Sequence, residues 1–66
     1  MTTEQKIDAL DAMCDDIKKQ QQQYAAELAA LRDKGKQKTA QFRETMGNKL
    51  TNSLIISRLQ VYGLWE

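Results

Sequence analysis

The stretch that decides the fold runs from residue 7 to residue 31 and reads IDALDAMCDDIKKQQQQYAAELAAL. Within it, one set of residues is spaced alternately by three and four positions, which is the spacing of the a and d positions of a heptad repeat. This heptad seam consists of Ile7, Leu10, Cys14, Ile17, Gln21, Tyr24, Leu28 and Leu31. A mostly apolar stripe of this kind needs a partner stripe, in its own chain or in another copy. The sequence therefore predicts a helix–helix interface at these positions.

The length of the chain limits how well it can cover that seam. A chain of 66 residues makes one small domain, residues 1–66, whose core rarely contributes more than ~3–5 kcal/mol. The single cysteine excludes an internal disulfide, and the absence of histidine removes the commonest zinc ligand. We expect no cofactor and no metal. What remains is association, as a homodimer, as a higher helical oligomer or with another helical protein.

Capping signals mark the ends of the first helix. Thr2 followed three residues later by Gln5 fits a capping box, which predicts a helix over about residues 3–33. Gly35, with a lysine on each side, is typical of a helix C-terminus and predicts a turn near 34–36. A helix continuing through this glycine is the alternative, because it would cost only ~1 kcal/mol.

The rest of the chain predicts a helical arm over about residues 37–62 that folds back. Gly47 is a soft stop within it, and Thr51–Ser53 offers N-cap residues for a restart. The side chains expected to dock on the seam are Phe42, Met46, Leu50, Leu54, Ile55, Leu59, Tyr62 and Trp65. The predicted fold class is all-α, a long heptad helix plus a shorter, broken arm. In architecture it is similar to small helical hairpins that dimerise into four-helix bundles.

Little in the sequence can carry chemistry. A catalytic triad or dyad that depends on histidine is impossible, and no phosphate-binding loop, CxxC or HExxH motif is present. Cys14 lies on the seam, where a thiol is usually a small buried apolar group. The acidic residues Asp8, Asp11, Asp15 and Asp16 lack the loop and the ligand count of a calcium site, which favours a solvated helix face. We expect no enzymatic activity.

Charge is distributed unevenly and leaves a second function open. Residues 1–31 hold three basic and six acidic residues, whereas residues 32–66 hold seven basic and three acidic residues. The two halves can attract each other, or the basic half can bind nucleic acid. A small DNA-binding regulator of helix-turn-helix type, using residues 34–62, is therefore the alternative function. Its candidate contacts are Lys34, Lys36, Lys38, Arg43, Asn52 and Arg58.

The favoured prediction is a non-enzymatic helical oligomerisation or adaptor module. No secretory signal and no apolar run long enough to cross a membrane are recognised, so we expect a cytoplasmic protein with no membrane partner. Two first helices in parallel would set Lys6 opposite Asp11 and Glu27 opposite Arg32, both attractive pairs. Alanines at positions 25, 26, 29 and 30 would also suit close antiparallel packing within a hairpin, so the parallel contact is favoured only slightly.

Overall fold

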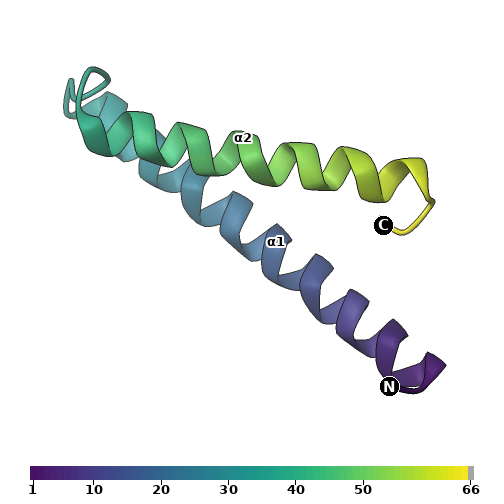
Figure 1. Ribbon diagram of the computed structural model, residues 1–66. Coiled ribbons are helices and arrows are strands. Elements are labelled where there is room, and N and C mark those ends of the chain that lie inside the picture. The colour runs from purple at the N-terminus through teal and green to yellow at the C-terminus, as the bar shows by residue number, and fades with distance from the viewer. Residues whose placement is uncertain (66) are drawn as a thin grey trace.

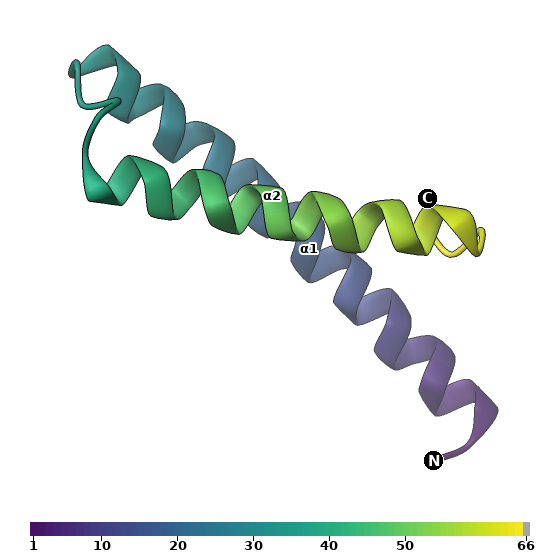
Figure 2. The ribbon, with the colours of Figure 1, turned by 45° about the horizontal axis from the view of Figure 1, so that its top comes forward.

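Residues 1–65 are described by a computed structural model and form two α-helices joined by a short turn. Helix α1 spans Thr3–Asp33 and helix α2 spans Ala40–Val61, and no strand occurs within residues 1–65. The two helices lie close together near the turn, cross at an angle and diverge toward their free ends (Figures 1 and 2). The predicted all-α helical hairpin is confirmed.

Both ends of α1 follow the sequence signals. The Gln5 N–H donates to Thr2 Oγ1 at 3.2 Å, and the Thr2 N–H donates to Gln5 Oε1 at 2.8 Å, which completes the predicted capping box. At the other end Gly35 has φ +69°, a conformation that glycine adopts at little cost. The N–H groups of Gly35 and Lys36 donate to carbonyls of Arg32 and Leu31, at 2.9 and 2.8 Å. This Schellman arrangement ends α1, and the turn predicted there is confirmed.

Helix α2 differs from the predicted arm in being unbroken. It begins at Ala40, where the Thr39 hydroxyl accepts from the Phe42 N–H at 3.2 Å, and it continues through Gly47. The predicted break is therefore wrong. One glycine costs a helix only ~1 kcal/mol. The hydroxyls of Thr51 and Ser53 do not cap a new helix, because each donates to a carbonyl one turn earlier at 3.0 Å.

The core of the hairpin is small and lies mainly near the turn. Leu28, Leu31 and Phe42 form its one cluster of buried apolar side chains within residues 1–65. Cys14 and Ile17 are also buried, in the first half of α1 and farther from the turn. The Cα radius of gyration is 14.8 Å, whereas a compact domain of this length has about 11 Å. The chain is thus an elongated hairpin that opens away from its turn.

Candidate helix-binding surface

The heptad seam of α1 is covered unevenly by α2. Four of its members are buried, namely Cys14, Ile17, Leu28 and Leu31, and three are partly buried, namely Leu10, Gln21 and Tyr24. Ile7 remains 53% exposed. The reason is geometric, because α1 has 31 residues and α2 has 22, and the helices diverge where α1 begins (Figure 1). The first turns of α1 therefore carry a part of the seam that α2 does not cover.

The middle of the α1–α2 interface is polar. Gln21 Nε2 donates to the Lys49 carbonyl at 3.2 Å and to Ser53 Oγ at 3.3 Å. Asn52, which is buried, donates from Nδ2 to Gln20 Oε1 at 3.0 Å. The Gln21 Oε1 atom is buried without a hydrogen-bond partner, which reduces the stability that this layer contributes. Directional bonds of this kind fix the register of the two helices more than they stabilise them.

The apolar side chains of α2 do not all dock as predicted. Phe42 is buried and Ile55, Leu59 and Trp65 are partly buried, but four members of the predicted set are exposed, namely Met46, Leu50, Leu54 and Tyr62. For these four the prediction is wrong within this chain. Steps of four residues rotate ~40° around a helix, so Leu50 and Leu54 lie ~80° and ~120° away from Phe42. Alternating steps of three and four keep Thr45 and Asn52 on the inner side, and both are buried.

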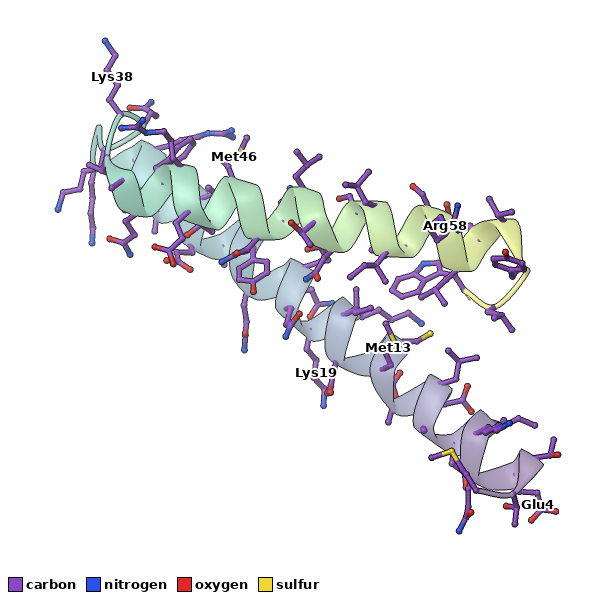
Figure 3. The ribbon with its side chains drawn as sticks, in the orientation of Figure 1. Glu4, Met13, Lys19, Lys38, Met46 and Arg58 are labelled. Atoms are coloured by element: carbon purple, nitrogen blue, oxygen red, sulfur yellow. The ribbon has the colours of Figure 1, made fainter. Side chains whose placement is uncertain are left out.

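The exposed residues Met46, Leu50 and Leu54 form a row along α2, which we call the outer ridge. Leu50 is 63% and Leu54 62% exposed. Met46 stands at the edge of α2 in Figure 3. Beside this ridge lies a groove between the helices of about 390 Å³, lined by Ala25, Leu28, Ala29, Arg32, Met46, Lys49, Leu50 and Ser53. The small alanines of α1 leave room there for side chains of another helix.

The C-terminal residues approach the first half of α1. Cys14 Sγ donates to the Leu64 carbonyl at 3.6 Å, and Lys18 Nζ lies 5.1 Å from the centre of the Trp65 ring. A hollow of about 420 Å³ lies between this tail and the start of α1, next to Ile7 and Leu10. Trp65 is partly buried, as expected of a docked tail, whereas Tyr62 is 70% exposed.

The candidate nucleic-acid contacts are not brought together. The turn lysines Lys34, Lys36 and Lys38 are exposed at one end of the molecule and Arg43 is exposed nearby on α2, but Arg58 lies far along α2 (Figure 3). Asn52 is buried against Gln20 and cannot reach a base edge. Since α2 is helical throughout residues 47–53, the turn of a helix-turn-helix is absent from this segment, and that part of the prediction is wrong.

The described residues offer no alternative site of a chemical kind. Within residues 1–65, no three histidine, cysteine, aspartate or glutamate side chains stand together as a metal site would require. Neither helix found there has the length and apolar character needed to cross a membrane. Comparison with protein-family models, curated proteins and solved structures finds no match to this chain. The open groove and the uncovered part of the seam are thus the features on which a function can be argued.

Proposed function

We propose that the chain is a non-enzymatic helical oligomerisation module that forms a homodimer in the cytoplasm. The observation that carries the proposal is the outer ridge, a row of large apolar side chains left exposed on a helix whose inner face is polar in its middle. Exposed apolar rows of this kind mark surfaces that bind protein. Ile7, at the uncovered end of the seam, extends the same argument to α1.

The exposed area of the chain supports this proposal. A compact monomer of 7.6 kDa exposes about 4300 Å² of surface, whereas this chain exposes 5241 Å². The excess is about 900 Å², close to the ~800 Å² that each partner buries in a stable protein interface. Association of two copies would therefore bring the surface buried per chain to the level of an ordinary small domain.

Solution mass and helicity measured over a range of concentration test the proposal. We expect a dimer mass by light scattering, with circular dichroism showing that helicity and the thermal midpoint rise with concentration. A fully helical chain with a monomer mass that does not depend on concentration at low micromolar levels would refute it. The variant Leu50→Glu should shift the chain toward monomer, and Gln60→Glu, on an exposed polar position of the same helix, serves as its control.

Nucleic-acid binding is the second candidate, favoured by the exposed lysines of the turn. It predicts an affinity for duplex DNA that falls steeply with salt, with a log–log slope set by the number of phosphates contacted. Fluorescence anisotropy with a labelled duplex at low salt is the measurement. Binding that Lys34→Glu and Lys36→Glu abolish would favour this function over oligomerisation alone, and no binding at low salt would remove it.

A further inference from the structure

We propose that the dimer is antiparallel, with the acidic start of α1 in one copy lying in the basic groove of the other. This inference rests on the proposed function, since it names the surfaces through which two copies associate. The acidic arm is residues 3–16, which hold five acidic residues and one basic residue. The basic end is residues 32–49, which hold six basic residues and two acidic ones. The two segments therefore carry opposite net charges of equal size, −4 and +4.

These two charged segments cannot neutralise each other within one chain. They lie at opposite ends of the molecule, as Glu4 and Lys38 show in Figure 3. From Leu10, in the middle of the acidic arm, to Arg32 is 22 residues along α1, or ~33 Å at ~1.5 Å per residue. Charges are screened over ~8 Å at physiological ionic strength. A second copy in the opposite orientation brings both pairs of segments together at once.

The apolar groups of the two segments also complement each other. The acidic arm presents Ile7, which is exposed and lies ~40° and ~80° around the helix from Asp11 and Asp15, on the same side of α1. The groove offers Ala25 and Ala29 as a shallow floor, with Arg32 and Lys49 among its lining residues. Acidic residues on this side of the arm, Glu4 and Asp15, would then face the cations Arg32 and Lys49.

Two-fold symmetry gives this contact a definite register. If Ile7 of one copy lies at the height of Ala29 in the other, then Glu4 lies at the height of Arg32. Asp15 then lies at the height of Gln21, which is hydrogen-bonded to the Lys49 carbonyl. The symmetry axis passes near Lys18, so each copy contributes one arm and one groove, and the assembly closes as a dimer. Equivalent residues are then far apart, because the two Ile7 positions are separated by 22 residues of α1, or ~33 Å. A parallel pair would instead set each residue beside its own copy.

Disulfide trapping distinguishes these arrangements. Two variants are prepared in a Cys14→Ser background, one with Ile7→Cys and the other with Ala29→Cys, and each is checked for helicity and mass. Under mild oxidation we expect the equimolar mixture to form a covalent heterodimer and neither variant to crosslink alone. Crosslinking of each variant with itself would show a parallel pair and overturn the inference while leaving the dimer intact. A dimer that forms no disulfide in either case would overturn it as well.

Charge reversal provides an independent test on the full chain. The variant Glu4→Lys/Asp15→Lys and the variant Arg32→Glu/Lys49→Glu should each weaken the dimer at least ~tenfold, because each sets like charges against one another. Their mixture should recover wild-type affinity, since one contact is then restored with its charges exchanged and the other is unchanged. The control Asp33→Lys changes an exposed charge outside the groove lining and should change affinity little.

The outcomes separate the inference from the proposed function. Wild-type chain that stays monomeric refutes both. A wild-type dimer whose affinity does not respond to charge reversal, or whose variant mixture shows no recovery, refutes the antiparallel contact and leaves the dimer standing. A mass that grows without limit as concentration rises would show an open head-to-tail chain, which also contradicts the closed arrangement.

Discussion

Replacing Gly47 by alanine tests directly whether α2 is one continuous helix. Gly47 is exposed in the middle of α2, and its φ is not positive. A Cβ built at this position meets no atom within 4 Å outside its neighbours and the helix backbone. Alanine should therefore gain the full difference in helix propensity, ~1 kcal/mol, with no steric cost. For a domain of this size that corresponds to an increase of ~4–8 °C in thermal midpoint.

The matched control is Gly35→Ala, since Gly35 also has open space around a built Cβ but has φ +69°. A left-handed conformation costs an L-residue ~1–2 kcal/mol, so this variant should be less stable than wild type. Both midpoints are measured by circular dichroism at one chain concentration, because association shifts them. A Gly47→Ala variant that is no more stable than wild type would refute the continuous helix and restore the predicted break. Equal effects at Gly47 and Gly35 would mean that the two glycines share one conformation.

Further substitutions probe the core, the polar layer and the caps. Leu28→Ala should cost ~2–5 kcal/mol in urea unfolding because Leu28 is 3% exposed, whereas Val61→Ala at an 80% exposed position should cost less than ~0.5 kcal/mol. Gln21→Leu should raise the urea midpoint, because it removes a buried oxygen without a partner, and a clear fall would contradict this account of the layer. Thr39→Ala removes the N-cap of α2 and should lower the free energy of unfolding by ~1 kcal/mol. The control is Thr3→Ala, which changes a threonine that caps no helix and should lower it less. Tryptophan emission should shift to the red on unfolding, because Trp65 is partly buried against Lys18, and emission that is already red in native buffer would place the tail in solvent.

The sequence predicted α1 well because local signals determine it. The capping box at Thr2 and the glycine at position 35 each act within a few residues of their own end of the helix, and the unbroken heptad register between them agrees with both. Gly63 ends α2 in the same local way, with φ +69° and a hydrogen bond from the Leu64 N–H to the Leu59 carbonyl. Signals of this kind need no knowledge of tertiary packing.

The inner face of α2 could not be chosen from hydrophobicity alone. The apolar row from Phe42 through Met46 and Leu50 follows four-residue steps, whereas the face that packs on α1 follows alternating steps and includes polar side chains. The inner face can be recognised in the sequence as a second heptad pattern whose middle members are polar. Its positions are 42, 45, 49, 52, 56 and 59. Thr45 and Asn52 were missed because a sequence-based search ranks apolar residues first, while Gln20 offers Asn52 a hydrogen-bond partner only in the folded hairpin.

The polar middle of the interface connects the fold with the proposed association. A layer that contains Gln21, Asn52 and a buried unpaired oxygen fixes how the helices meet but contributes little stability, so the hairpin depends on the small cluster near its turn. A core of this size contributes at most ~3–5 kcal/mol. Binding of a second copy at a concentration ~100-fold above Kd adds ~2.7 kcal/mol by linkage, which is comparable with the whole core. Folding and dimerisation should therefore be coupled, and substitutions on the outer ridge should lower the unfolding midpoint as well as the mass.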